Sequence, residues 1–453
     1  MQPCQLCSPT LVRNVLLLSP KGADGFSRGD NWYNFGRRDK KEKTLDAYDY
    51  CKYLVETWPN RWTGSVSERE SGNWMERELA RMGYETRQVR FDCPGWEYDG
   101  EEFYLAGRRL QAGAQFYSVG CDVAGPIAVV TPDGQGRFRG EAKGKIALLK
   151  EAETKDIIDR NKVLEALEAA GARAAVIVSE YRDTYSTKMF RNPESRLPAV
   201  GVSGVVGEEL YGSTGKEARL VIRARQTRSS TGNVFAQRGP ASGPVLMVCA
   251  HHEASPASPG AYDNASGIGV VLEMAERFSK AKVGALLRFA GFGGHEFGAF
   301  GSKRYVRDYE DEARQIKRLL VFDAVGVKGM DPSITAWGGK EMMEGVRAFA
   351  ERRPGVRFKA GKGSAAGDAG SFSPIGTESV WVSVSDWSKA APFHSPLDDM
   401  RWIGREALAE DVEIGVALLK EWMREFGVEC EGVRINVERS PGPRASCSPE
   451  DIQ

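Results

Sequence analysis

Residues 249–267 read CAHHEASPASPGAYDNASG and place several potential metal ligands between two apolar runs. His251 and His252 end the first run, Glu253 follows them, and Asp263 closes a loop rich in Ser, Pro and Gly. The first run, PVLMVCA, is typical of a buried strand, and the run that begins after Asp263 has the length and spacing of a helix. The stretch therefore predicts a strand, a loop that carries ligands, and a helix.

The same alternation continues toward the C-terminus. Apolar segments at 285–294, 318–327 and 379–386 predict further strands, and amphipathic segments at 301–317, 340–353 and 405–426 predict helices between and after them. Strands that alternate with helices favour a mainly parallel sheet with helices on both faces. We therefore expect an α/β fold with a mainly parallel mixed sheet.

The N-terminal half reads differently. Helices are predicted at 44–58 and 67–83, a strand at 84–91, and then, from residue 119, a series of short apolar strands with a helix at 161–172. This segment contains no histidine and ends before the polar stretch QTRSST, which we interpret as a linker. The pattern predicts a compact inserted module at 119–225, structural or binding in role, without catalytic chemistry.

The domain borders follow from these changes in character. We expect one domain built from 44–118 and 226–430, the inserted module at 119–225, a disordered leader at 1–43 and a loose tail at 431–453. The leader holds Cys4 and Cys7, a single C-x-x-C that is a weak indication of metal binding.

The composition excludes several classes of function. The 453 residues contain 62 Lys plus Arg and 62 Asp plus Glu, so charge gives no argument for nucleic acid or an anionic membrane as partner. No apolar run approaches the roughly 18 residues that span a bilayer. The eight cysteines are scattered and form no disulfide framework. We expect a cytoplasmic protein, or a secreted one if the true start or its signal is missing.

Five candidate ligands fall where this sheet would bring them together. They are two histidines and three carboxylates, each placed at or shortly after a predicted strand or in the loop before a helix: His251, Asp263, Glu296, Asp323 and His394. The carboxyl ends of parallel strands meet at one edge of the sheet. The set suits zinc, with cobalt or manganese as substitutes, and one bridging carboxylate would give each of two metals three ligands. Taken singly, a histidine at a strand end is usually a satisfied polar residue, and an aspartate before a helix is usually an N-cap.

Several motifs together resemble a known family. RWTGS at 61–65, the H-x-E…GAYDNASG stretch, GGHEFGAFGS, VFDAVG and HSPLDD are similar to motifs of the co-catalytic di-zinc aminopeptidases of the bacterial leucyl aminopeptidase and aminopeptidase Y type. Residues 119–225 resemble the protease-associated (PA) domain that some members carry. The resemblance covers roughly residues 45–430 and implies the zinc exopeptidase fold.

The resemblance also implies a role for each ligand. One zinc ion would be held by His251 and Asp323, the other by Glu296 and His394, with Asp263 bridging the two. A second group of residues would support the ligands: Glu253, where the family usually has Asp, would buttress His251, and Asp398 would do the same near His394. The peptide bond after Asp263 would be cis.

One position departs from the family pattern. Two adjacent glutamates normally stand before the G-x-x-G-S element, the first as general base and the second as ligand, but here the pair is His295-Glu296. An imidazole can act as a general base near neutral pH. It could also bind metal itself, so a metal-binding relative with lost or altered activity, or a different amide reaction, stays open.

The function that the resemblance implies is that of a zinc-dependent exopeptidase. We expect an aminopeptidase that removes N-terminal residues from peptides by means of metal-activated water, with two zinc ions as cofactors and His295 and Glu253 as catalytic residues. Its partners would be a peptide substrate and, through the PA domain, other proteins. The alternative is a binding protein that keeps the metals and has lost the activity.

Overall fold

The computed structural model describes residues 45–154, 156–187 and 195–435. The predicted leader with Cys4 and Cys7, and all but the first five residues of the predicted tail, lie outside this part of the chain.

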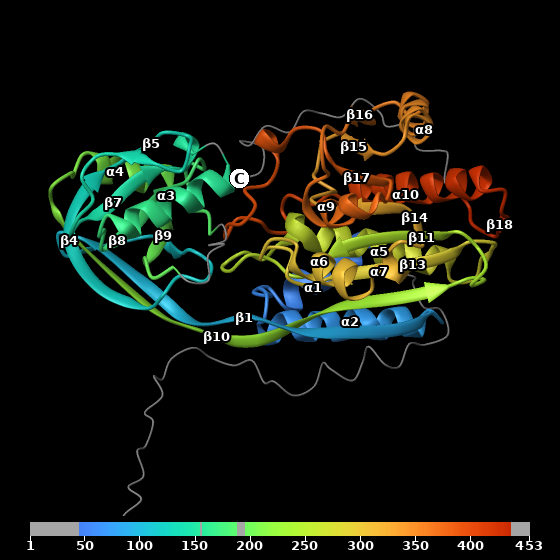
Figure 1. Ribbon diagram of the computed structural model, residues 1–453, viewed down its shortest axis with the longest axis horizontal. Helices are drawn as coiled ribbons and strands as arrows, with labels where there is room; N and C mark the ends of the chain where they lie inside the picture. Colours follow the sequence, from blue (N-terminus) through green and yellow to red (C-terminus); the bar gives the residue numbers. More distant parts are fainter. Residues whose placement is uncertain (1–44, 155, 188–194, 436–453) are drawn as a thin grey trace, which may run out of the picture. The chain divides into compact units, whose positions relative to one another are not determined.

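Four parallel strands form the centre of the main sheet (Figure 1). In spatial order they are β13 (Leu286–Phe292), β11 (Val245–His251), β14 (Ile316–Phe322) and β17 (Ser379–Val384). On one side β17 pairs with the antiparallel β15 (Pro332–Trp337), which pairs in parallel with β16 (Arg357–Ala360), and on the other side β13 pairs with the antiparallel β10 (Glu217–Arg238). The sheet is thus mixed and mainly parallel, which confirms the predicted fold class.

The side chains of β11 alternate between two hydrophobic cores. Leu246, Val248 and Ala250 belong to one core, and Met247 and Cys249 to the other. Because successive residues of a strand point to opposite faces, both faces of the sheet are covered.

Different helices supply the two cores. The first core contains residues of α1 (Ala47–Thr57), α2 (Val66–Arg81), α5 (Ser266–Phe278), α8 (Lys340–Glu351) and α10 (Arg405–Glu425). The second contains residues of α6 (Phe300–Asp308), α7 (Glu310–Ala313) and α9 (Gly367–Phe372). The helix predicted over 301–317 is therefore too long: Tyr309 leaves the helical conformation between α6 and α7, and from Ile316 the chain is strand β14.

Two very long strands lead from this sheet into the inserted module. β1 (Glu85–Leu105) pairs antiparallel with β10 almost throughout, from Glu85 opposite Gln237 to Leu105 opposite Ala218 (Figure 1). The predicted linker QTRSST is wrong, since residues 226–231 lie within β10 and pair with β1. Their polar side chains are compatible with a ribbon that is only partly buried.

The inserted module has its own core, formed by residues between Trp96 and Ile222. Its elements are β2 (Arg108–Leu110), β3 (Gly113–Ala114), β4 (Cys121–Val129), β5 (Thr131–Pro132), β6 (Phe138–Arg139), β7 (Ile146–Lys150), α3 (Ile157–Ala169), β8 (Ala174–Val178), β9 (Ala199–Val202) and α4 (Gly204–Tyr211). β4, β7, β8 and β9 are parallel neighbours in that order. The core also draws on residues 96–118, which precede the segment expected from the sequence.

Within the part of the chain that the structure describes, no helix combines the length and the apolar character that crossing a bilayer requires.

Candidate metal centre

The carboxyl ends of the four central strands bring the candidate ligands together. His251 is the last residue of β11, Asp323 follows directly after β14, Glu296 lies four residues after β13, and His394 lies in the loop after β17. Asp263 sits in the irregular turn η3 (Ala261–Ala265) before α5, and its bond to Asn264 is cis. It does not cap α5, whose N-cap residue is Ala265.

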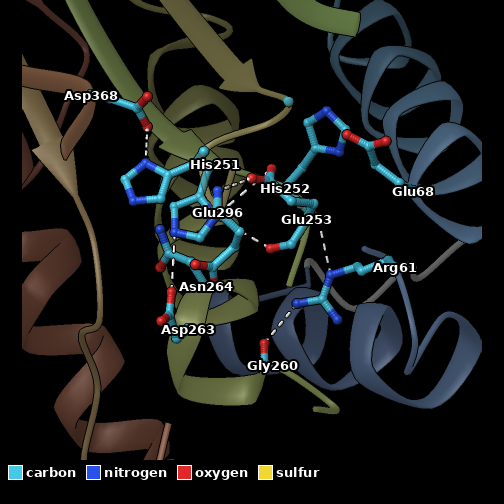
Figure 2. A network of polar contacts seen from close by, with 12 residues as sticks. Arg61, Glu68, His251, His252, Glu253, Gly260, Asp263, Asn264, Glu296 and Asp368 are labelled. Carbon is cyan, nitrogen blue, oxygen red and sulfur yellow. Dashed lines mark hydrogen bonds and ion pairs between the residues drawn. The ribbon is translucent and has the colours of Figure 1, made fainter. Parts of the chain in front are cut away.

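The carboxylate of Asp263 lies between the two histidines. Its Oδ1 is 3.1 Å from His251 Nε2 (Figure 2). Its Oδ2 is 2.9 Å from His394 Nε2. Asp323 Oδ1 lies 3.4 Å from His251 Nε2, and Glu296 Oε1 lies 2.9 Å from His394 Nε2. Each histidine therefore faces one further carboxylate, and Asp263 shares its two oxygens between them.

The imidazole nitrogens and carboxylate oxygens of this cluster are ligands that zinc prefers, and within the described part of the chain two of these atoms make no hydrogen bond. His251 Nε2 and Glu296 Oε1 are buried and make no hydrogen bond to the described residues, although each lies close to another polar atom. Buried polar atoms are normally satisfied. An ion placed among them would accept the lone pairs that hydrogen bonds leave free, so the residues fit a metal.

The charges of the cluster lead to the same conclusion. Among the residues that the structure describes, the ion pairs of Asp263, Glu296 and Asp323 are with histidines only. Burial lowers the pKa of His394, but Glu296 and Asp263 raise it more strongly, to about 10. A cluster of buried carboxylates thus demands positive charge, and metal ions can supply it while the imidazoles stay neutral.

Comparison with known proteins places this geometry in a family. Residues 233–417 match Peptidase family M28, and residues 104–210 match the PA domain. Aminopeptidase YwaD of Bacillus subtilis (strain 168) is 28% identical over 436 residues, which cover 92% of each chain. The structure of BSAP, a zinc aminopeptidase from Bacillus subtilis, aligns with a TM-score of 0.70 at 25% identity and covers 83% of this chain and 94% of that one. Residues 233–417 of this chain are thus similar to peptidases of family M28.

A further structure shares the fold at lower identity. The peptidase M28 precursor from Shewanella amazonensis aligns with a TM-score of 0.73 at 19% identity, over 82% of this chain and 91% of that one. The resemblance inferred from the sequence, an M28-type peptidase with an inserted PA domain, is confirmed.

His295 lies at the edge of the candidate metal centre. Its ring stacks on His251 with centroids 4.0 Å apart and planes 8° apart, and its Nε2 is 3.9 Å from Asp323 Oδ2. Burial and His251 lower the pKa of His295, but Asp368 and Asp323 raise it by a larger amount, so that the pKa is about 9. Metal cations nearby would act in the opposite direction and favour the neutral ring.

Two carboxylates support the ligands through the main chain. Glu253 Oε1 accepts a hydrogen bond of 2.8 Å from the amide of Glu296, while the Glu253 carbonyl oxygen, 3.2 Å away, is closer to His251 Nδ1 than its carboxylate, 3.8 Å away. Asp398, expected beside His394, instead accepts hydrogen bonds from the amides of Tyr262 and Asp263, at 2.7 and 3.1 Å. It therefore fixes the turn that carries the central carboxylate.

The second histidine of the opening stretch does not belong to the centre. His252 is buried, and its Nε2 lies 3.0 Å from the carbonyl oxygen of Gly232, so that this nitrogen carries the proton. Burial lowers its pKa to about 4.

A buried arginine holds the ligand loop in place. Arg61, from the RWTGS motif, donates to the carbonyl oxygens of His252 at 2.9 Å and Gly260 at 2.6 Å (Figure 2). It also donates to the carbonyl oxygen of Pro259 at 2.7 Å. Gly260 has a φ of +62°, and a Cβ there would lie 3.0 Å from the guanidinium. Sequence reasoning recognised the motif but not this role, because the contacts span about 200 residues.

We expect Arg61→Lys to destabilise the protein by about 3 kcal/mol. An ammonium group cannot reach all three carbonyls, and each one left buried and unpaired costs about 1–3 kcal/mol. The free energy of unfolding, from urea denaturation followed by circular dichroism, checks this. The matched control is Arg139→Lys at an exposed site, which should change stability by less than about 0.5 kcal/mol. A loss below about 1 kcal/mol at Arg61 would contradict the role.

The PA domain contacts the loop of one ligand directly. The amide of Thr187 donates to the carbonyl oxygen of His394 at 2.8 Å, and its hydroxyl donates to that of Pro256 at 2.5 Å. His394 has a φ of 56°, in the left-handed region that non-glycine residues rarely adopt. The inserted domain therefore contributes to the shape of the ligand loop, a role that the sequence did not suggest.

Proposed function

We propose that this protein is a zinc-dependent aminopeptidase with His251, Asp263, Glu296, Asp323 and His394 as its metal ligands. The observation that carries the proposal is the position of Asp263, whose two oxygens face two separate histidine–carboxylate pairs. The match of residues 233–417 to Peptidase family M28 supports hydrolysis of peptide bonds. The named relatives YwaD and BSAP, an aminopeptidase and a zinc aminopeptidase, support an exopeptidase that acts at N-termini and takes zinc.

The zinc ions and the side chains of the protein would have different roles in the reaction. When bound, two zinc ions polarise the scissile carbonyl and make a water molecule more acidic. His295 Nε2 can accept a proton from the attacking water and return it to the leaving amine. Glu253 keeps Glu296 in place through the Glu296 amide, and Asp398 keeps Asp263 in place in the same way.

A peptide with a free N-terminus is the substrate, and the PA domain would offer a surface to protein partners. We propose a cytoplasmic location, supported by the free thiols of Cys51, Cys93, Cys121, Cys249 and Cys430. Cell fractionation with the full-length chain would test it.

Metal content and turnover test the function together. We expect about two zinc ions per chain by plasma mass spectrometry, and turnover of leucine p-nitroanilide that a chelator abolishes and added zinc restores. N-acetyl-leucine p-nitroanilide is the matched control and should not be cleaved, because its amine is blocked. A zinc-loaded protein without turnover would favour the alternative, a metal-binding relative that has lost its activity. Cleavage of the acetylated substrate at a similar rate would contradict an aminopeptidase.

A further inference from the structure

The imidazole of His295 is held by a carboxylate that lies far away in the sequence. Its Nδ1 is 3.0 Å from Asp368 Oδ2, across 73 residues, and Asp368 is only 1% exposed. Figure 2 shows Asp368 directed toward the group of histidines and carboxylates. The contact is therefore a buried one, built by the fold and not by neighbouring residues.

Asp368 is itself fixed on its other oxygen. Its Oδ1 accepts a hydrogen bond of 2.6 Å from Ser302, whose hydroxyl lies 2.8 Å from that of Ser371. Ser302 belongs to α6 and Ser371 to α9, so two helices of the second core anchor the carboxylate. A carboxylate bound in this way has little freedom to turn away from the imidazole.

The ring of His295 is also held by residues other than Asp368. His251 stacks on the ring at 4.0 Å, and a Cβ built on Gly367 would lie only 3.1 Å from His295 Cε1. The ring is therefore confined between His251 and the start of α9.

These contacts decide which ring nitrogen carries the proton. An ionised carboxylate can only accept hydrogen bonds, so the nitrogen that faces it must be protonated in a neutral ring. Nδ1 then carries the hydrogen, and the lone pair lies on Nε2, which faces Asp323 at the metal centre.

We propose that Asp368 is a positioning residue that fixes His295 in the Nδ1–H tautomer and directs the Nε2 lone pair toward the metal centre. Asp368 would then orient His295 in the way that an additional side chain orients the general base in many active sites. The inference rests on the proposed function, because a proton acceptor has a purpose only if the site hydrolyses a substrate. The glutamate that the family pattern has at this position would not need a carboxylate behind it, whereas His295 does.

Nitrogen NMR of the histidine rings tests the tautomer without reference to activity. The chain has only four histidines, so protein labelled with ¹⁵N-histidine and loaded with zinc gives a spectrum that single substitutions can assign. We expect His295 as the Nδ1–H form. His252 is a built-in reference of the opposite kind, since its Nε2 faces a carbonyl oxygen. A wild-type spectrum with His295 as the Nε2–H form would overturn the proposal.

Kinetics of Asp368→Asn supply the second arm. An amide can donate as well as accept, so the ring is no longer held in one tautomer. We expect the Nδ1–H signal of His295 to weaken and kcat to fall by about 10²-fold with KM nearly unchanged. The matched variant Ser302→Ala keeps the carboxylate and should keep the tautomer, with a fall in kcat of less than about 10-fold.

The outcomes separate this inference from the proposed function. Normal turnover with unchanged tautomer and kcat in Asp368→Asn would overturn the positioning role alone. Absent turnover in the zinc-loaded wild type would overturn the proposed function. If Asp368→Asn fails to fold, the wild-type tautomer still decides.

Discussion

Asp263→Ala is expected to abolish turnover of leucine p-nitroanilide and to reduce the zinc content from about two ions per chain to one or none. Asp263 is the residue whose oxygens face both histidine–carboxylate pairs, at 3.1 and 2.9 Å. Without it, each zinc ion would retain only two protein ligands. Loss of a catalytic metal removes several kcal/mol of transition-state stabilisation, so kcat should fall by at least about 10³-fold.

The control for this variant is Asp92→Ala, at an exposed position of β1. It should keep both zinc ions and wild-type kcat. Circular dichroism of zinc-free wild type and zinc-free Asp263→Ala should agree, because His251 still faces Asp323 and His394 still faces Glu296 after the substitution. An Asp263→Ala protein that still binds two zinc ions and turns over substrate normally would rule out the bridging role.

The second large effect is expected at His295. His295→Asn should lower kcat by about 10²–10⁴-fold, the usual contribution of a general base, with zinc content near two ions per chain. The amide of asparagine can replace the Nδ1–H donor to Asp368 but offers no basic nitrogen in place of Nε2. The variant therefore separates loss of the base from loss of the buried hydrogen bond.

Two further variants sharpen the result. His295→Glu restores the residue that the family pattern has, and it should retain measurable turnover if a proton acceptor at this position is what the reaction needs. His252→Ala removes a buried histidine outside the centre and should lower stability while kcat changes by less than about 10-fold. If the wild type is inactive and His295→Glu gains turnover, His295 marks lost activity. If His295→Asn instead loses a zinc ion, His295 is a metal ligand.

The fold class could be predicted because its signals are local. The apolar runs of β11, β13, β14 and β17 and the helical periodicity of α5 and α10 are properties of short segments. They fail where two segments compete: the expected helix at 301–317 ends early because the apolar face of Ile316, Leu319 and Val321 packs in the sheet. The polar stretch 226–231 resembles a linker because its residues are polar. Its pairing with β1, more than 100 residues earlier in the chain, leaves no local signal in the sequence.

The candidate ligands were also within reach of the sequence. Parallel strands with helical crossovers bring their carboxyl ends to one edge, so a histidine or carboxylate at or shortly after each strand is expected there. This holds for His251, Glu296, Asp323 and His394. The hydrogen-bond partners of the supporting residues could not be predicted from the sequence, as Asp398 illustrates. It was expected near His394 from its place in the sequence, but its hydrogen bonds go to the turn at Asp263.

The sequence alone thus determined the α/β class, the inserted domain and the set of candidate metal ligands, since these depend on local patterns and on the direction of strands. Only the tertiary structure decided that Asp368 lies behind His295, that Arg61 holds the ligand loop and that Thr187 contacts the loop of His394. Such contacts depend on how helices and loops pack over the sheet. A difference of a few ångströms there makes or breaks a hydrogen bond, and no local pattern records it.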